Sequence, residues 1–314
     1  MTSVPVLAGR HVELAVSPSE AVEAVRVAFV AHARGEWTMP PKVYVTNYPA
    51  GDFRAMPALG AGHALLKWVT SFPGNPQRGL PTVSGVVLVS DAQTGLLEAV
   101  LDAATVTALR TGAAAVLAAD TLGRADAATA AVVGAGVNGR AVARTFLARG
   151  RDVLLWDVDE RRARTAADEL GADVARSRDE ALAADLLVTV TPGHDVVLHQ
   201  GVLRPGQHVS LMGADGPDKS EVAPHEVARA RVFCDDWEQA SHGGELTGAV
   251  AAGVLARDRV TELGAVLTGQ ASGRASASEI TLFDSTGLAI QDLAVALAAL
   301  ERVDELPELP RFSL

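Results

Sequence analysis

A glycine-rich segment near the middle of the chain has the spacing of a dinucleotide-binding turn. Ala131-Val132-Val133-Gly134-Ala135-Gly136-Val137-Asn138-Gly139 ends an apolar strand-like run and opens a helical pattern. Gly134 would permit the tight turn, Gly136 the approach of the backbone to a pyrophosphate, and Gly139 the close packing of helix on strand. The N–H groups at the helix start would then bind the phosphates.

An acidic residue follows this segment at the distance that such a site needs. Asp157 ends the next strand-like run, 23 residues after Gly134. Its carboxylate could accept hydrogen bonds from both ribose hydroxyls and would repel a 2′-phosphate. The sequence therefore predicts NAD rather than NADP, and Arg161 and Arg162 close behind keep NADP as the alternative.

Three charged residues elsewhere stand among apolar or small residues. Lys67 lies in Ala64-Leu65-Leu66-Lys67-Trp68-Val69 with no carboxylate nearby in sequence, so it either reaches solvent at a sheet end or has a pKa lowered by burial. Arg110 precedes a run of small residues that begins at Thr111. Asp215 follows a strand-like run that ends at Gly213, at the sheet edge where open α/β folds bind ligands. All three are candidate site residues.

The elements that must position these residues differ between the two parts of the chain. From Ala128 onward, short apolar strands alternate with helical patterns over 137–149 and 160–170, which indicates a parallel sheet covered on both faces. The expected strands are Thr129–Gly134, Asp152–Asp157, Asp185–Thr191, His208–Gly213 and Val232–Asp236.

The first part of the chain reads as α+β. Helical patterns cover 19–33 and 105–122, and a last apolar helix is expected from Gly287 to about Val303, able to pack back on this part. Strands are expected at Lys42–Asn47, Ala64–Phe72 and Thr82–Ser90. We therefore predict an α/β protein with a Rossmann dinucleotide-binding domain over 125–289. The second predicted domain is α+β and consists of residues 1–124 and 290–314.

Bulk composition is that of a globular enzyme and narrows the possible partners. The chain has 314 residues, 48% hydrophobic and 21% charged, and a net charge of −11, which disfavours nucleic-acid binding. We find no secretory signal and no run long enough to span a membrane. The single cysteine, Cys234, cannot form an internal disulfide, which fits a cytoplasmic protein. The histidines show no metal-ligand spacing, so no metal is expected.

Several sequence motifs of four to six residues resemble those of the ornithine cyclodeaminase/μ-crystallin family, and among its members those of the archaeal-type alanine dehydrogenases. The resemblance covers nearly the whole chain, and the glycine loop lies between these motifs in the order that the family has. The motifs are Met39-Pro40-Pro41-Lys42-Val43-Tyr44, Phe53-Arg54-Ala55-Met56-Pro57-Ala58, Leu66-Lys67-Trp68-Val69, Gly79-Leu80-Pro81-Thr82-Val83, Leu109-Arg110-Thr111-Gly112-Ala113-Ala114, Gly213-Ala214-Asp215-Gly216-Pro217 and Phe283-Asp284-Ser285-Thr286-Gly287.

The resemblance implies roles for individual residues. Lys42, Lys67 and Arg110 would surround a substrate carboxylate, with Lys67 also near the reacting amine or carbonyl and Asp215 as acid/base. It further implies that the α+β domain binds substrate and pairs two subunits into a homodimer. The cofactor would be lined by a set of residues around the glycine loop: Thr82, Thr111, Gly134, Gly136, Val137, Asn138, Gly139, Asp157, Thr191, Lys219 and Ser285.

Two positions depart from the cyclodeaminase pattern that the resemblance brings. Lys42 stands where cyclodeaminases commonly have arginine, and a lysine offers a point charge instead of a planar fork. Arg54 stands where ornithine-cyclising members carry an acidic residue, and a cation there would repel a second amine. Arg54 would instead help to bind a carboxylate, which favours a small or acidic amino acid as substrate.

The hypothesis is an NAD-dependent oxidoreductase that interconverts a small L-amino acid, with alanine as the first candidate, and its 2-oxo acid plus ammonia. Alternatives are a reductase of cyclic imines or N-substituted amino acids, and an ornithine-type cyclodeaminase. A non-enzymatic alternative is a μ-crystallin-like protein that binds NAD(P)H or another ligand without turnover.

Overall fold

The computed structural model describes residues 3–192, 195–213, 216 and 219–313. The chain forms two compact units, one of Met1–Arg110 with Leu288–Leu314 and the other of Thr111–Gly287. The first change of unit falls within helix α3 (Ala103–Leu122), before the boundary at residue 124 that the sequence suggested. A break in contacts inside a continuous helix leaves no signal in composition, which is why the sequence placed the boundary after the helix.

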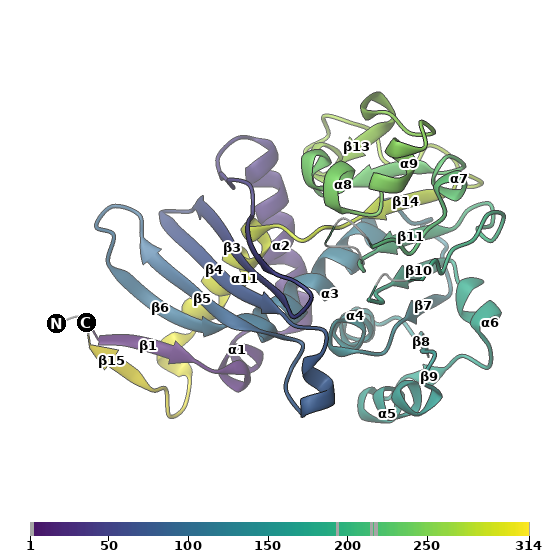
Figure 1. Cartoon of the computed structure of the whole chain (residues 1–314). Helices are drawn as coiled ribbons and strands as arrows, with labels where there is room; N and C mark the ends of the chain where they lie inside the picture. Colours follow the sequence, from purple (N-terminus) through teal and green to yellow (C-terminus); the bar gives the residue numbers. More distant parts are fainter. Residues whose placement is uncertain (1–2, 193–194, 214–215, 217–218, 314) are drawn as a thin grey trace. The chain divides into compact units, whose positions relative to one another are not determined.

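The first unit contains a seven-stranded mixed sheet. Its strand order is β15-β1-β6-β5-β4-β3-β2, with β1 and β6 parallel and all other neighbours antiparallel. The terminal strands β1 and β15 lie side by side at one edge (Figure 1). The strands are β1 (Ser3–Leu7), β2 (Val43–Asn47), β3 (Gly51–Gly60), β4 (His63–Ser71), β5 (Val83–Asp91), β6 (Leu97–Asp102) and β15 (Arg311–Ser313).

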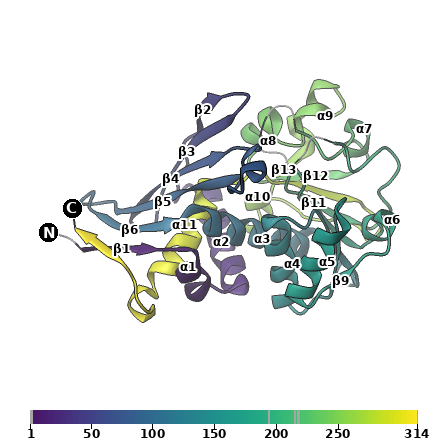
Figure 2. The same ribbon diagram turned by 60° about the horizontal axis from the view of Figure 1, so that its bottom comes forward.

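Helices cover one face of this sheet. Figure 2 shows α11 (Ala289–Leu300) and α2 (Pro18–Ala33) on the same side of β3 to β6, and the two helices contact each other. The expectation that the last helix packs on the first part of the chain is confirmed. Helix α2 starts where Ser17 and Glu20 form a reciprocal capping box. The remaining elements are α1 (Gly9–Ala15) and the short 3₁₀ turns Asn75–Arg78 and Val303–Glu305.

The two faces of the sheet differ in chemistry because side chains alternate along each strand. On β4, Leu65, Lys67 and Val69 are buried while Leu66 and Trp68 are exposed. Directly paired residues share a face, so the same division extends to the neighbouring strands. The face opposite to that of Lys67 carries six exposed apolar side chains, here called the apolar face: Val43, Val45, Leu59, Leu66, Trp68 and Val86.

The second unit is a Rossmann-type parallel sheet of eight strands, in the order β13-β12-β14-β11-β10-β7-β8-β9. The chain starts in the middle at β7, builds outward through β8 and β9, and returns to the other side of β7 at β10, so the topological switch point lies between β7 and β10. Its strands are β7 (Ala130–Val133), β8 (Val153–Trp156), β9 (Asp173–Val174), β10 (Leu186–Thr189), β11 (His208–Leu211), β12 (Arg231–Cys234), β13 (Val260–Glu262) and β14 (Thr281–Asp284).

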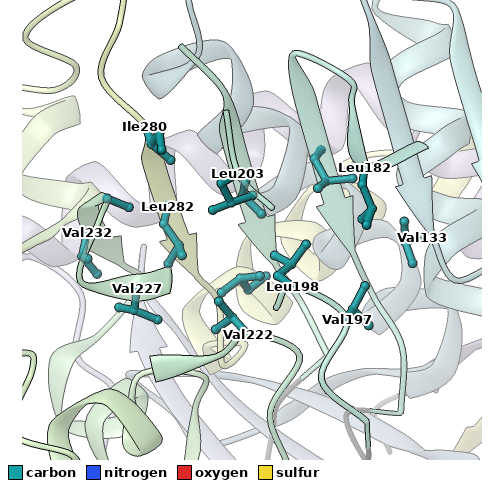
Figure 3. Packing of buried hydrophobic residues seen from close by; sticks show 14 of the residues in the cluster. Val133, Leu182, Val197, Leu198, Leu203, Val222, Val227, Val232, Ile280 and Leu282 are labelled. Carbon is teal, nitrogen blue, oxygen red and sulfur yellow. The ribbon is translucent and has the colours of Figure 1, made fainter. Parts of the chain in front are cut away.

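Short apolar strands make the core of this unit. Val133, Leu187, Val209 and Leu282 from four neighbouring strands are all buried, and they join one cluster with apolar residues of the connecting segments (Figure 3). The helices are α4 (Val137–Ala148), α5 (Glu160–Leu170), α6 (Arg178–Leu182), α7 (Pro224–Val227), α8 (Trp237–Gly243), α9 (Thr247–Ala251) and α10 (Leu263–Leu267), with a 3₁₀ turn at Arg257–Arg259. Among the described residues, no helix has the length and hydropathy required of a membrane span.

Candidate functional site

Lys67 occupies a core position of the first unit. It lies on the helix-covered face of β4, between Met56 of β3 and Val87 of β5, and is 1% exposed. Its Nζ donates to Oδ1 of Asp292 on α11 at 3.0 Å. Burial lowers the pKa of Lys67 to about 8, partly offset by the Asp292 carboxylate. Of the two expectations for this lysine, burial with a lowered pKa is confirmed.

Arg110 joins the same cluster from α3. Its Nε lies 3.6 Å from Oδ1 of Asp292, so one carboxylate oxygen faces two cations. Nε of Arg110 and Oδ2 of Asp292 are buried and make no hydrogen bond. A buried N–H donor that makes no hydrogen bond is costly, so Nε of Arg110, beside the Lys67 ammonium, is available to a polar anionic ligand.

Sequence reasoning missed Asp292, because the residue lies 225 positions from Lys67 and only the fold brings the two together. One signal was available: Asp292 is the only charged residue in the twelve-residue helix α11. A lone acid in an apolar helix needs a buried partner.

Arg54 lies on the same sheet face but already has an acidic partner. Its Nε and Nη2 contact the two carboxylate oxygens of Asp52 at 2.6 and 3.2 Å, and its guanidinium lies 5.4 Å from the ring centre of Tyr44. The Arg54 charge still lowers the pKa of Lys67. Sequence reasoning did not foresee the Asp52 pair, which reduces the net charge that Arg54 presents.

The other expected site residues of the first unit are less enclosed. Lys42 directly precedes β2 and is half-buried, and Thr82 directly precedes β5 and is also half-buried. The carbonyl oxygen of Thr82 accepts from the N–H of Phe72. Their predicted contacts with substrate and cofactor stay predictions.

The glycine loop of the second unit has the geometry that the sequence predicted. Gly134 follows β7 with φ +108°, and a Cβ there would lie 2.6 Å from the carbonyl oxygen of Val190 at the end of β10. A Cβ on Gly139 would lie only 1.7 Å from the carbonyl oxygen of Gly134, so helix and loop touch. Gly136 is the N-cap of α4, and a Cβ there would meet nothing within 4 Å. The helix start is therefore open for a ligand.

Asp157 follows β8 and is tied to this loop. Its carboxylate accepts from the N–H groups of Ala135 at 2.8 Å and Asp159 at 2.9 Å. Arg162 lies 3.6 Å from Oδ1, so the basic residue behind Asp157 pairs with it in part. Val137 and Val158 flank this place with large exposed apolar side chains, at 71% and 87%. Asn138, the second residue of α4, is half-buried.

A buried glutamate holds the ends of β10 and β11 together. Glu221 accepts from Oγ1 of Thr189 and the N–H of Thr191, both at 2.6 Å, and from the N–H of Gly213 at 3.1 Å. A Cβ on Gly213 would lie 2.5 Å from the Glu221 carboxyl carbon, so any side chain there would displace that carboxylate. Burial raises the pKa of Glu221. The sequence analysis did not single out this residue.

Further acids lie at the same end of the parallel sheet. Oε2 of Glu245 accepts from the N–H of Glu221 at 2.6 Å, and Asp235 accepts from Oγ of Ser285 at 3.1 Å. Burial, followed by the neighbouring carboxylates, raises the pKa of both Glu245 and Asp284. Ser285, expected to line the cofactor, thus has its hydroxyl committed to Asp235.

The last three predicted site residues are Asp215, Lys219 and Thr111. Asp215, the expected acid/base, lies outside the described residues. Lys219 is half-buried, and its N–H donates to the carbonyl oxygen of Gly216. Thr111 is buried, and its hydroxyl makes no hydrogen bond. Within the described part of the chain, no group of three or more His, Cys, Asp or Glu side chains could hold a metal ion.

Comparison with known proteins gives one family over nearly the whole chain. The model of the ornithine cyclodeaminase/mu-crystallin family matches residues 4–306. An alanine dehydrogenase of Archaeoglobus fulgidus is 41% identical over 304 residues, which cover 94% of each chain.

Solved structures agree with this assignment. An archaeal alanine dehydrogenase dimer with bound NAD is similar with a TM-score of 0.94 and 39% identity, covering 100% of both chains. A Δ1-pyrroline-2-carboxylate reductase of Thermococcus litoralis, solved with NADH and L-proline, has a TM-score of 0.90 and 27% identity, covering 96% of this chain and 98% of that one. The chain belongs to the ornithine cyclodeaminase/mu-crystallin family.

Proposed function

We propose that the protein is an NAD-dependent oxidoreductase that interconverts a small L-amino acid, alanine first, and its 2-oxo acid plus ammonia. The observation that carries the proposal is the buried cluster of Lys67, Arg110 and Asp292, in which Nε of Arg110 makes no hydrogen bond. Two cations against one carboxylate leave a net positive charge, which suits the carboxylate of an amino or oxo acid. The 41% identity to an alanine dehydrogenase supports the substrate class.

The residues of the second unit fit a dinucleotide. Gly136 has no side chain with which to cap α4, so the first N–H groups of that helix are available to a pyrophosphate. The open space at Gly136 and the Asp157 carboxylate beside the loop complete the arrangement. When bound, NAD accepts a hydride from the substrate α-carbon, and as NADH it returns one. Asp157 favours NAD over NADP because its charge would repel a 2′-phosphate.

Lys67 would have two tasks at the substrate. Its ammonium binds the carboxylate or polarises the carbonyl oxygen together with Arg110, which orients the α-carbon. With a pKa of about 8, Lys67 can also give or take a proton near neutral pH. Lys42 and Arg54 would add positive charge on the substrate side.

Asp215 would act as the second proton-transfer group. In deamination it would take a proton from the water that attacks the substrate iminium, and in the reverse direction it would return that proton. Gly213, two residues earlier in the sequence, donates its N–H to Glu221. Thr82, Thr111, Thr191, Lys219 and Ser285 complete the proposed cofactor lining.

A reductase of cyclic imines is the second candidate. It is favoured by the similarity to the pyrroline-2-carboxylate reductase solved with L-proline. The same lysine and arginine would bind the carboxylate of a cyclic imine, so the cluster supports both reactions. A cyclodeaminase is less well supported, because Arg54 would repel a second amine.

A panel of substrates tests the proposal. The purified protein is mixed with NADH, ammonia and 2-oxo acids led by pyruvate, or with pyrroline-2-carboxylate alone, and absorbance is followed at the NADH band. We expect rapid oxidation with pyruvate and a loss of about 10²–10⁴-fold in Lys67→Ala. Turnover with the imine alone would favour the second candidate. Tight NADH binding without turnover on any member would contradict both and favour a binding protein.

We also propose that two copies form a homodimer through the apolar face of the first unit. Six exposed apolar side chains gathered on one sheet face exceed what a surface without a partner usually shows. The archaeal alanine dehydrogenase of similar structure is a dimer.

A further inference from the structure

The cluster around Lys67 has one acidic member that joins both cations. Oδ1 of Asp292 lies 3.0 Å from Nζ of Lys67 and 3.6 Å from Nε of Arg110. The three residues come from β4, α3 and α11, which are remote in sequence. Because one oxygen atom contacts both cations, it fixes where they stand relative to each other.

The surroundings of Lys67 give it no other acid of comparable closeness among the described residues. Its strand neighbours Met56 and Val87 are apolar. The charges that act on Lys67 are those of Asp292, Arg110 and Arg54, and Arg54 is itself paired with Asp52.

The helices packed on α11 add no further charged group next to Lys67 among the described residues. The residues that α2 buries are all apolar: Ala21, Val22, Val25, Ala28, Phe29 and Ala31. Helix α1 contributes one buried titratable side chain, His11, which hydrogen bonds to the N–H of Ala8 and to Nε of Arg10. Of the acids in the described part of the chain, Asp292 is the one that directly stabilises the charged form of Lys67.

We propose that Asp292 is a positioning residue of the active site, which holds Lys67 and Arg110 at the separation that a substrate carboxylate requires and keeps Lys67 charged at neutral pH. The inference rests on the proposed function for its catalytic meaning, whereas the electrostatic role can be tested without any substrate. Asp292 does not have to touch the substrate for this role.

Removal of the Asp292 charge has a defined consequence. In Asp292→Asn the desolvation of Lys67 and the repulsion from Arg110 and Arg54 remain, while the attraction is lost. The pKa of Lys67 then falls below about 8, and the lysine becomes neutral over more of the physiological range. In Arg110→Gln the sign is opposite, because a repelling cation is removed and the pKa of Lys67 rises.

The small number of lysines makes the measurement direct. The chain has only Lys42, Lys67 and Lys219, so protein labelled with 13C at lysine Cε gives three side-chain signals to follow against pH. Assignment uses Lys42→Arg and Lys67→Arg. We expect the Lys67 signal to titrate near pH 8 in the unaltered protein and at least one pH unit lower in Asp292→Asn.

A matched control removes a different acid of the first unit, Glu98 on β6. Glu98 pairs with His63 at the start of β4 at 2.7 Å, and Glu98→Gln makes the same change of charge away from the cluster. This variant should leave the Lys67 titration where it is. Asp292→Glu, which restores the charge, should move it back toward that of the unaltered protein.

The outcomes separate the inference from the proposed function. An unchanged Lys67 titration in folded Asp292→Asn would overturn the role of Asp292. Should that variant fail to fold, an unchanged Lys67 titration in folded Arg110→Gln would show that Arg110 does not stand close to Lys67, which would overturn the claim that Asp292 holds the two cations together. The expected shifts in a protein with no turnover on any amino or oxo acid would overturn the proposed function and leave the positioning role in place.

Discussion

Lys67 is a charged residue at a strand position that the fold would otherwise fill with an apolar side chain. Burial lowers its pKa from 10.5 to about 8, so the ammonium predominates below that pH and the neutral amine above it. With pyruvate varied at a fixed concentration of free ammonia, we expect kcat/KM for reductive amination to fall as pH rises through about 8. The physical reason is that only the ammonium binds the carboxylate.

Lys67→Arg serves as the control for this pH profile. An arginine stays charged throughout the accessible range, so the fall near pH 8 should disappear even though the rate is lower. A fall of the same size at the same pH in Lys67→Arg would assign the titration to another group.

Asp157 is expected to select the dinucleotide. Asp157→Asn keeps an oxygen for the N–H of Ala135 but removes the charge that pairs with Arg162 and that would face the ribose. A charged hydrogen bond contributes about 1.5–3 kcal/mol, so NADH binding should weaken by roughly 10–100-fold, while NADPH binding weakens less or improves. Quenching of protein fluorescence gives both Kd values.

The neighbouring Asp159 supplies a control for Asp157. It caps α5 and accepts from the N–H groups of Arg161 and Arg162, so Asp159→Asn removes the same charge two residues away. That variant should lower stability slightly and leave the ratio of NADH to NADPH affinity unchanged. An equal ratio in all three proteins would contradict the role of Asp157.

Single site residues could be predicted from the sequence where the residues next to them in the chain form a recognisable pattern. The glycine loop and Lys67 are such cases, because local spacing or a local contrast in polarity marks them. Asp292, Glu221 and Asp52 were missed, since each gains its meaning from a contact that only the fold creates. Asp215 and the cofactor-lining hydroxyls came from the family resemblance and remain predictions.

At the scale of elements, the turn between β7 and α4 allows a paired test of two glycines. In Gly139→Ala the new Cβ would lie 1.7 Å from a backbone oxygen that cannot move away, so the unit must distort. Overpacking costs about 1–3 kcal/mol, and we expect Tm to fall by several degrees.

Gly136→Ala is the matched variant, since its Cβ meets nothing within 4 Å. We expect a nearly unchanged Tm and at least tenfold weaker NADH binding, because the methyl group occupies the space in front of the helix start. Calorimetry and NADH titration measure the two effects. Equal loss of stability in both variants would contradict this division of roles.

Elements with strong local patterns were predicted well, and irregular ones were not. Helix α5 has the expected bounds, and the five strands expected in the second unit are present within one or two residues at each end. Strand β3 was not expected, because it contains Pro57, a residue that sheets tolerate mainly at edges. Pro57 lies beyond the part of β3 that pairs with β2, where its missing N–H costs less. Strand β14 has only four residues and gave no periodic signal.

At the scale of the whole chain, the division into two parts was predicted from the pattern of elements, because short apolar strands begin to alternate with helices near residue 128. The unit boundary inside α3 was not predicted, because a helix can continue through a change of neighbours without any change in its own pattern. The apolar face was also missed as a surface. Its members come from four strands, and strand register, which local sequence does not specify, brings them to one side.

Pairing of two copies through the apolar face is the prediction that belongs to this scale. Each copy has a net charge of −11, so two copies approach with less repulsion through a face of mostly apolar side chains, on which Asp102 pairs with Val86 at one end. Trp68 lies near the middle of that face, stacked on Phe53 at 5.7 Å between ring centres. In Trp68→Glu a charge would be buried without a partner at the interface, which disfavours association by several kcal/mol.

Light scattering after size-exclusion chromatography decides the question. We expect twice the chain mass of 32.5 kDa for the unaltered protein and a single chain mass for Trp68→Glu. Leu14→Glu is the control, because Leu14 is 62% exposed on α1, outside the apolar face, and takes the same charge. It should remain a dimer. A dimer that persists in folded Trp68→Glu would place the contact elsewhere, and an unaltered protein of single chain mass would mean that the apolar face stays open to solvent.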